Sequence, residues 1–267
     1  MKRTIIFFLA LCFASCLYAQ ENQAVTYFSS NYLKEKVPYQ LYFPKMVKKQ
    51  LKEADLLVVL DGGEYAGIAQ NTMELYIFGE KMKPNIILSL PSTPKSRWSY
   101  FTPTKASADN DGGQDTLYQH TGNFNLFADF LEKELIPHIE SQYQIKIQEK
   151  NIFGHSMGGL GVLSFLVLRP EIFDNYISAS PSTMYDQHYI FKTIEEKGKL
   201  DFNKLFLTAA LNDSNGYREN VDWLDSYLET NSNKKQKKMK RIYPTETHGT
   251  SGIRSLIDGL EFIYQSK

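Results

Sequence analysis

Residues 151–160 read Asn-Ile-Phe-Gly-His-Ser-Met-Gly-Gly-Leu, and this stretch decides the fold. Its centre, residues 154–158, matches Gly-x-Ser-x-Gly, the pattern of a sharp strand-to-helix turn that exposes a serine hydroxyl above a sheet. The glycines allow a close backbone approach that side chains would block. Residues 151–153 resemble the end of a buried strand, and residues 158–168 resemble a buried helix. A turn that merely packs closely is the alternative, but this context favours Ser156 as a nucleophile.

Short apolar runs predict the strands around this turn. Residues 55–60 and 85–90 are continuous apolar runs, which suit strands buried on both faces of a mostly parallel sheet. Residues 66–80, between them, predict a helix. Residues 24–32 and 37–43 are rich in β-branched and aromatic side chains and predict two early antiparallel strands.

The rest of the chain alternates in the same way. The expected strands are residues 173–177, 205–211 and 239–243, and the expected helices are residues 123–143, 186–197, 217–230 and 251–264. Pro137 should kink or shorten the first of these helices. Residues 91–121 predict a long polar loop, which in a compact domain is usually functional or disordered. The pattern indicates one α/β domain over residues 22–267.

The amino terminus predicts a signal peptide. Residues 1–3 are Met-Lys-Arg, an apolar run follows, and small residues lead to Ala19. We expect cleavage after residue 19, which removes both cysteines, Cys12 and Cys16. The sequence before Cys16 also resembles a lipoprotein box, so a lipid anchor at Cys16 is the alternative to release into the periplasm or medium.

Composition excludes several classes of function. Without residues 1–19 the chain has 28 basic and 30 acidic side chains, which gives no sign of a nucleic-acid partner. The basic run at residues 234–241 is expected to be a solvated surface. A mature chain without cysteine has no thiol nucleophile and no cysteine-ligated metal. Residues 109–115 resemble a fragment of a calcium loop, but no glutamate is correctly placed after them, so we expect a solvated loop and no metal.

A serine nucleophile needs a base, and His248 is the candidate. The hydroxyl is weakly nucleophilic until a base takes its proton. In strand–turn–helix hydrolases the order along the chain is serine, then acid, then histidine. His248 lies between the last predicted strand and the last predicted helix, whereas His155 is inside the turn and His188 comes too early.

The acid that orients the histidine should follow the preceding strand. Asp213 stands there, directly after residues 205–211. Its neighbours, Asn-Asp-Ser-Asn-Gly, are also typical of an ordinary turn. Glu219 and Asp222, early in the next helix, therefore remain alternatives.

Two backbone amides are candidates for binding the oxyanion of the reaction. One is the amide of Met157, the residue after the nucleophile. The second should lie after an earlier strand, where Asp61-Gly62-Gly63 follows residues 55–60. We expect the amide of Gly63 to be this donor, and a simple strand-exit turn is the alternative.

The order of these motifs is similar to that of a known family. The motifs are Leu60-Asp61-Gly62, Arg97 with Thr102-Pro103, Gly154 to Gly159, Ser180-Pro181-Ser182 and Glu246-Thr247-His248-Gly249. Over nearly all of the mature chain they resemble the putative-esterase family of α/β-hydrolases, which is related to enterochelin (ferric siderophore) esterases, esterase D and mycobacterial mycolyltransferases. The resemblance implies the α/β-hydrolase fold, with a mostly parallel central sheet flanked by helices, and ester hydrolysis without a cofactor.

The chain departs from that family in the expected pocket walls. Family members often carry Arg-x-Arg-Asp-x-Thr-Pro, but residues 97–103 keep only the first Arg and the Thr-Pro. Many carry Trp-Trp after Ser-Pro-Ser, where this chain has Met184 and Tyr185. We therefore expect Arg97, Tyr100 and Tyr185 to bind substrate, with Trp98 and Tyr118 as further aromatic walls or as anchors of the loop.

The sequence thus predicts an exported serine esterase that uses Ser156, His248 and Asp213. Its substrate would be a siderophore ester or an acylated carbohydrate. An acyltransferase with the same three residues and a non-catalytic binding protein that keeps the fold remain alternatives.

Overall fold

The computed structural model describes residues 24–45, 51–106, 116–213 and 216–264. The predicted signal peptide with Cys16 and the acidic residues 109–115 lie outside these ranges. The elements, in chain order, are β1 (Thr26–Ser29), β2 (Lys36–Tyr42), β3 (Glu53–Leu60), α2 (Gly62–Phe78), β4 (Asn85–Leu90), α3 (Pro94–Tyr100), the 3₁₀ helix η1 (Thr116–His120), α5 (Phe124–Phe130), the π-helical segment η2 (Leu131–Leu135), α6 (Ile136–Tyr143), β5 (Lys146–His155), α7 (Met157–Leu168), β6 (Asn175–Ala179), α8 (Tyr185–Lys197), β7 (Lys204–Ala210), α9 (Tyr217–Asn231), β8 (Lys237–Tyr243) and α10 (His248–Tyr264).

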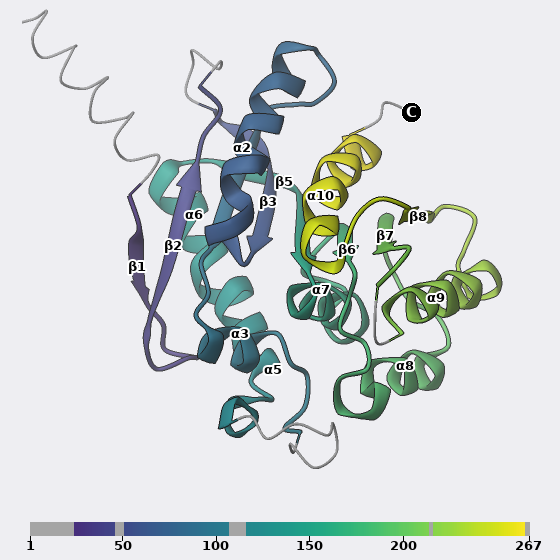
Figure 1. Ribbon diagram of the computed structural model, residues 1–267. Coiled ribbons are helices and arrows are strands. Elements are labelled where there is room, and N and C mark those ends of the chain that lie inside the picture. The colour runs from purple at the N-terminus through teal and green to yellow at the C-terminus, as the bar shows by residue number, and fades with distance from the viewer. Residues whose placement is uncertain (1–23, 46–50, 107–115, 214–215, 265–267) are drawn as a thin grey trace, which may run out of the picture.

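The strands of the described residues form one sheet in the order β1-β2-β4-β3-β5-β6-β7-β8 (Figure 1). β1 and β2 pair antiparallel, as do β2 and β4, and every later pair is parallel. The continuous apolar runs explain this arrangement, because strands β3 and β4 are buried almost throughout. The mostly parallel α/β architecture expected from the sequence is confirmed.

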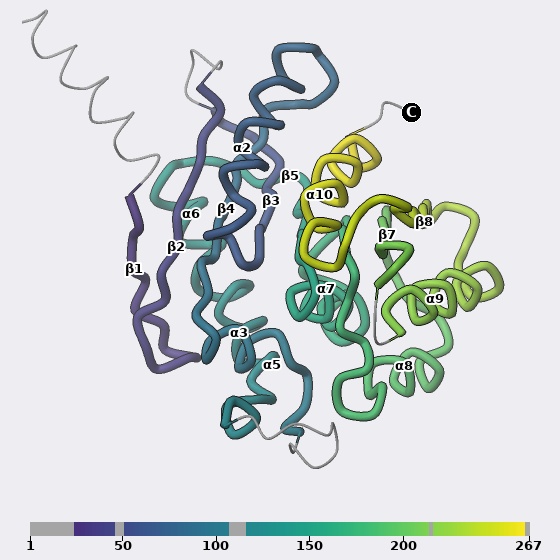
Figure 2. Tube along the Cα trace, in the orientation of Figure 1, coloured from purple at the N-terminus to yellow at the C-terminus, as the bar shows by residue number. Residues whose placement is uncertain are grey.

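Helices cover both faces of the sheet, which divides the core into two layers. On one face α2 and α10 pack over a cluster that includes Leu57, Phe153 and Phe206. On the other face α5, α7 and α8 pack over a larger cluster that includes Phe127 and Phe165. The trace in Figure 2 shows α2 and α10 together on their side of the sheet. Helix α7 is buried on nearly every side, as its apolar sequence predicts.

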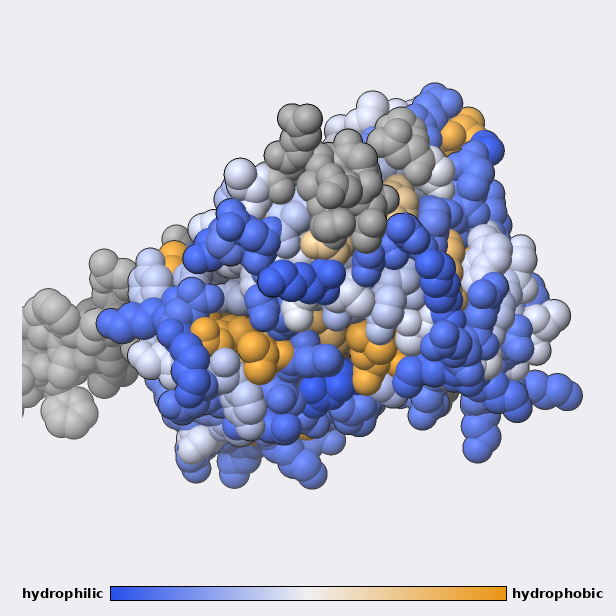
Figure 3. Space-filling model, turned by 90° about the horizontal axis from the view of Figure 1, so that it is seen from below, coloured by the Kyte–Doolittle hydropathy of each residue, from blue (hydrophilic) through white to orange (hydrophobic). Residues whose placement is uncertain are grey.

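The fold brings the expected site residues to one edge. Asp61, Ser156, Ser180 and Asp213 follow strands β3, β5, β6 and β7 in turn, and His248 follows β8. The carboxyl ends of parallel strands meet at the same edge of a sheet, where ligands of open α/β proteins bind. Figure 3 views the molecule from this side and shows a mostly hydrophilic surface with separate hydrophobic patches.

Residues 91–121 are not the continuous loop that their polarity suggests. Their described part contains helix α3 and the 3₁₀ helix η1. A capping box starts α3: the amide of Ser96 donates to the hydroxyl of Thr93 at 3.2 Å, and the amide of Thr93 donates to the hydroxyl of Ser96 at 2.8 Å. Pro94, at the first helical position, fits this start.

Other boundaries also differ from the prediction. The expected helix over residues 123–143 is divided by η2, which ends two residues before Pro137. Proline has no backbone N–H to donate within the helix. β6 begins at Asn175, because Phe173 packs against Phe165 outside the sheet, with ring centroids 4.9 Å apart. α10 begins at His248 itself. Within the described residues no helix is both long and apolar enough to cross a membrane.

Candidate active site

The turn at Ser156 has the strained geometry that exposes a nucleophile. Ser156 joins β5 to α7 with φ 59° and ψ −117°, a backbone conformation that residues other than glycine rarely adopt. A Cβ on Gly154 would overlap the carbonyl of Gly158, so this position requires glycine. The amide of Ser156 donates to the carbonyl of Ala179 at 2.9 Å, which ties the turn to the neighbouring strand.

Ser156, His248 and Asp213 form a hydrogen-bonded chain. His248 Nε2 lies 3.0 Å from Ser156 Oγ, and His248 Nδ1 lies 2.8 Å from Asp213 Oδ1. The Asp213 side chain is fully buried, whereas about a third of the His248 side chain is exposed (32%). The structure therefore brings together the three residues that the sequence selected from distant parts of the chain.

The carboxylate of Asp213 is held in place by two further donors. The hydroxyl of Ser180 donates to Asp213 Oδ2 at 2.7 Å, and the amide of Ala210 approaches the same oxygen at 3.3 Å. A buried carboxylate needs such partners, since burial without them is costly. Ser251, in the first turn of α10, lies 3.0 Å from the Ser180 hydroxyl and donates to the carbonyl of His248 at 3.1 Å.

The alternative acids are engaged elsewhere. Asp222 pairs with Lys240 at 2.6 Å, and Glu219 pairs with Arg218 at 2.9 Å. Lys240 belongs to the basic run of residues 234–241, in which Lys238 pairs with Asp225. These contacts account for the run as a partly ion-paired surface next to α9.

The ring of His248 contacts two other aromatic rings. Tyr217 contacts it with centroids 4.3 Å apart, and His155 with centroids 4.9 Å apart. The helix that carries His248 approaches His155 through a glycine. A Cβ on Gly252 would overlap the hydroxyl of Tyr65 and lie 2.9 Å from Cγ of His155. His155, inside the turn, therefore packs against His248, the predicted base.

Burial keeps the ring of His155 neutral. The side chain is only 7% exposed, and its Nε2 has no hydrogen-bond partner. Desolvation, followed by the neighbouring His248, lowers the pKa of His155 to about 4. The same burial, with Asp61 nearby, raises the pKa of Tyr65 to about 12. Tyr65 packs against His155 with ring centroids 6.0 Å apart, and both of these rings are therefore uncharged near neutral pH.

The two predicted oxyanion donors stand at the starts of two helices. Met157 is the first residue of α7, and Gly63 is the second residue of α2. The turn before α2 contacts the turn at Ser156, because a Cβ on Gly158 would lie 3.1 Å from Asp61 Oδ2. Amides in the first turn of a helix lack partners within the helix. The roles of Met157 and Gly63 stay predictions.

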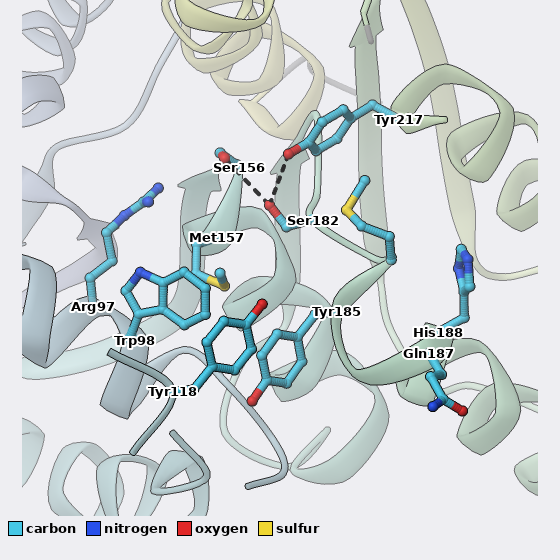
Figure 4. Close-up of a pocket in the computed structure, with 11 residues that line it drawn as sticks. Arg97, Trp98, Tyr118, Ser156, Met157, Ser182, Tyr185, Gln187, His188 and Tyr217 are labelled. Carbon is cyan, nitrogen blue, oxygen red and sulfur yellow. Dashed lines mark hydrogen bonds between the residues drawn. The ribbon is translucent and has the colours of Figure 1, made fainter. Parts of the chain in front are cut away.

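An open cavity of about 520 Å³ lies beside Ser156. Most of its walls are aromatic or thioether side chains (Figure 4). The lining residues are Arg97, Trp98, Tyr118, Ser156, Met157, Ser182, Met184, Tyr185, Gln187, His188 and Tyr217. A cavity of this size and composition suits an organic substrate or one part of a larger one.

Of the three expected substrate-binding residues, two line this cavity and one does not. Arg97 and Tyr185 lie on it, and the Tyr185 hydroxyl donates to the carbonyl of Thr104 at 2.7 Å. The structure corrects the prediction for Tyr100, which is buried in the core. Its ring stacks on Phe127 at 5.1 Å and its hydroxyl donates to Glu35, because the α3 helix turns Tyr100 away from Trp98.

Arg97 is also part of the scaffold. Its Nε donates to Asp61 Oδ2 at 2.8 Å, and its Nη2 approaches the carbonyl of His155 at 3.3 Å. Ser92 donates to the other oxygen of Asp61. A second cavity, of about 340 Å³, adjoins the first at Arg97 and Trp98 and is also lined by Asp61 and His155. Arg97 thus links the turn before α2 to the end of β5.

Three contributors to the site went unassigned in the sequence. Ser180 and Ser182 belong to a Ser-Pro-Ser motif after β6. The motif was part of the family pattern, but it did not indicate what either serine does. Tyr217 carried no signal at all, since a tyrosine at the start of an amphipathic helix is ordinary. Among the described residues, no group of histidine and acidic side chains is arranged to hold a metal ion.

Comparisons with known proteins find an esterase family model and esterase relatives. A family model described as "Putative esterase" matches residues 30–248. The ferri-bacillibactin esterase BesA of Bacillus subtilis is 43% identical over 74 residues, which are 28% of this chain and 25% of that protein. The apo-salmochelin esterase of Escherichia coli O6:H1 is 32% identical over 132 residues, 48% of this chain and 41% of that protein. The matches therefore span less than half the length of these two relatives.

A solved structure extends the likeness to most of the fold. The IroE-like serine hydrolase from Shewanella oneidensis superposes with a TM-score of 0.80 and 26% identity. The superposition covers 90% of this chain and 79% of that one.

Proposed function

The chain belongs to the putative esterase family, and we propose that it is a serine hydrolase that cleaves a carboxylic ester bond of a siderophore. The observation that carries this proposal is the hydrogen-bonded chain from Ser156 through His248 to the buried Asp213. A serine joined in this way to a histidine and a carboxylate is the arrangement that activates a hydroxyl for acyl transfer.

In the proposed first step, Ser156 Oγ attacks the ester carbonyl while His248 Nε2 takes its proton. Asp213 holds the ring and stabilises its positive charge during this transfer. The amides of Met157 and Gly63 would stabilise the negative oxygen that develops, an effect worth about 3–4 kcal/mol for each donor. The intermediate collapses, His248 protonates the leaving alcohol, and the acyl group stays on Ser156.

In the second step, His248 takes a proton from water, and the resulting hydroxide attacks the acyl carbonyl. The bond to Ser156 Oγ breaks, its electron pair goes to that oxygen, and His248 returns the proton. The acid product leaves, and the chain from Ser156 to Asp213 is restored. Each part of the cycle uses one histidine as base and then as acid.

The relatives support a siderophore as the substrate class. BesA is named a ferri-bacillibactin esterase, and the E. coli relative is named an apo-salmochelin esterase. The cavity of this chain presents the rings of Trp98, Tyr118 and Tyr185 beside the serine. Flat rings of that kind can pack against an aromatic part of a substrate.

The test compares ester substrates of different classes. We expect the protein to hydrolyse p-nitrophenyl acetate and butyrate. We also expect it to linearise or shorten a cyclic triester siderophore, and chromatography of the products measures this. The same assays on Ser156→Ala provide the control. Equal rates for the two proteins would overturn the assignment of a serine hydrolase, and turnover of acetylated sugars without any turnover of siderophores would overturn the substrate class.

We further propose that the protein works outside the cytoplasm. The support is the signal-peptide pattern of residues 1–19. Expression of the full chain in a Gram-negative host, followed by fractionation and amino-terminal sequencing, tests this. A mature protein that begins at Gln20 in the periplasm or medium is expected; a protein that starts at Met1 in the cytosol would refute export, and a lipidated Cys16 would favour a membrane anchor instead.

A further inference from the structure

Ser156 Oγ has a second hydroxyl neighbour besides His248. Ser182 Oγ lies 3.4 Å from Ser156 Oγ and 3.4 Å from the hydroxyl of Tyr217. Figure 4 shows this line of hydroxyls running from Tyr217 through Ser182 to Ser156. Neither Ser182 nor Tyr217 belongs to the three-residue chain on which the proposed function depends.

Ser182 is fixed where it can act on that oxygen. Its amide donates to the carbonyl of Ser156 at 3.0 Å, and the residue is 6% exposed. Pro181, before it, has a fixed backbone angle that limits the freedom of this turn. A short, buried side chain on a tied backbone loses little entropy when it forms a hydrogen bond.

The donor directions in the line follow from the triad. In the resting enzyme the Ser156 hydroxyl donates its proton to His248 Nε2, so its oxygen can accept from Ser182. Ser182 can in turn accept from Tyr217, because a hydroxyl donates once and accepts twice. Each bond polarises the next, so Tyr217 strengthens the bond that Ser182 donates.

We propose that Ser182 is a catalytic hydrogen-bond donor to Ser156 Oγ that acts chiefly in hydrolysis of the acyl-enzyme, with Tyr217 as its positioning residue. This inference rests on the proposed serine-hydrolase function and assigns a role within that site.

The chemistry explains why the second half of the reaction should benefit more. When the acyl-enzyme is hydrolysed, the bond between the carbonyl carbon and Ser156 Oγ breaks and the electron pair moves to Oγ. A donor at Oγ stabilises this developing charge before His248 delivers the proton. In the first half, the same donor eases loss of the serine proton but weakens the attacking lone pair, so its two effects oppose each other.

The first test is Ser182→Ala with p-nitrophenyl acetate. Acylation is followed as the release of p-nitrophenol in stopped flow, and the lifetime of the acyl-enzyme is followed by intact-protein mass spectrometry after substrate is removed. We expect the acyl-enzyme to decay about 10-fold more slowly, the effect of one hydrogen bond to a developing charge. The acylation rate should change less than about 3-fold. Ser226→Ala, an exposed serine on α9, is the matched control.

A second test asks whether Tyr217 acts through Ser182. Tyr217→Phe keeps the ring against His248 and removes only the hydroxyl, so acyl-enzyme decay should slow by about 3-fold. In Ser182→Ala/Tyr217→Phe the decay should equal that of Ser182→Ala alone, because the Tyr217 bond has lost its partner. Tyr227→Phe on the same helix, whose hydroxyl donates to the carbonyl of Gly198 at 2.9 Å, is the control.

The outcomes separate this inference from the function beneath it. If Ser156→Ala keeps its activity, the proposed function fails. Ser156 can prove essential while Ser182→Ala slows acylation and acyl-enzyme hydrolysis equally, or slows neither. In that case the donor role of Ser182 is overturned, but the proposed serine-hydrolase function stands. Multiplicative effects of the two substitutions would overturn the positioning role of Tyr217.

Discussion

Asp213 holds His248 with one carboxylate oxygen and Ser180 with the other. Oδ1 lies 2.8 Å from His248 Nδ1, and Oδ2 accepts from Ser180 Oγ at 2.7 Å. The carboxylate therefore cannot rotate without breaking a bond on its far side. This double attachment fixes the tautomer and the direction of the imidazole, with Nε2 facing Ser156.

Asp213→Asn should abolish most of the activity while the fold remains. An amide can donate to Nδ1, which would leave the wrong nitrogen of His248 protonated. In serine proteases the corresponding change of Asp to Asn lowers kcat by about 10⁴-fold. We expect a fall of about 10³- to 10⁴-fold in kcat for p-nitrophenyl butyrate, with KM little changed. Asp222→Asn, whose carboxylate pairs with Lys240, should keep near-normal activity. A variant at Asp213 with a tenth or more of the normal rate would show that another group orients His248.

Most of the architecture could be predicted because it depends on local pattern. Continuous apolar runs identified the buried strands, and the glycines around Ser156 identified the turn. Chain order then selected His248 and Asp213, because each follows a strand of a parallel sheet. These features depend on the composition of single segments and on their order along the chain.

What could not be predicted depends on contacts between segments. The polar sequence of residues 91–121 did not predict helix α3, which begins at a capping box. This helix places Trp98 at the cavity and Tyr100 in the core. The two rings that contact His248 come from β5 and α9, and no spacing rule connects them. The role of Ser180 likewise appears only when its hydroxyl is seen on Asp213.

His155 should make the protein less stable as the pH falls. Its pKa is about 4 when folded and near 6.5 when unfolded, so between these values the unfolded chain binds the extra proton. The loss of folding stability caused by His155 is therefore absent above pH 6.5. It grows as the pH falls toward 4, to an upper limit of about 3 kcal/mol.

Urea unfolding at pH 7.0 and 4.5 measures this effect. The loss of unfolding free energy on acidification should be about 2 kcal/mol smaller for His155→Asn than for the unsubstituted protein. His248, Arg97 and Tyr65 face this ring and are the same in both proteins. His138→Asn, at an exposed histidine, is the control. Equal losses for His155→Asn and the unsubstituted protein would mean that His155 accepts a proton in the folded state.

Gly252→Ala should displace the base rather than unfold the domain. The added methyl group would overlap the hydroxyl of Tyr65 and crowd the ring of His155, so α10 must shift at the turn that carries His248. We expect kcat/KM to fall about 10-fold or more, since small misplacements of catalytic groups are costly. Gly249→Ala, at an open position of the same turn, is the control. Normal activity of Gly252→Ala would show that the spacing is not critical.

Arg97→Ala should reduce stability as well as activity. It would leave the carboxylate of Asp61, whose side chain is 7% exposed, without its cation. We expect a loss of about 2 kcal/mol, measured by urea unfolding, because an uncompensated buried charge is costly. Arg97→Ala/Asp61→Asn should regain part of that stability but not the substrate affinity. An unchanged unfolding free energy for Arg97→Ala would show that its pairing with Asp61 contributes nothing.

The proposed mechanism requires that Ser156 is the nucleophile and that His248 and Asp213 activate it. The most direct measurement is reaction with a fluorophosphonate, followed by peptide mapping and a parallel esterase assay. We predict one modified residue, Ser156, with activity lost in proportion to labelling, and labelling slowed at least about 100-fold in His248→Ala. Labelling at another residue, or hydrolysis that continues in fully labelled protein, would contradict the role of Ser156 as the nucleophile.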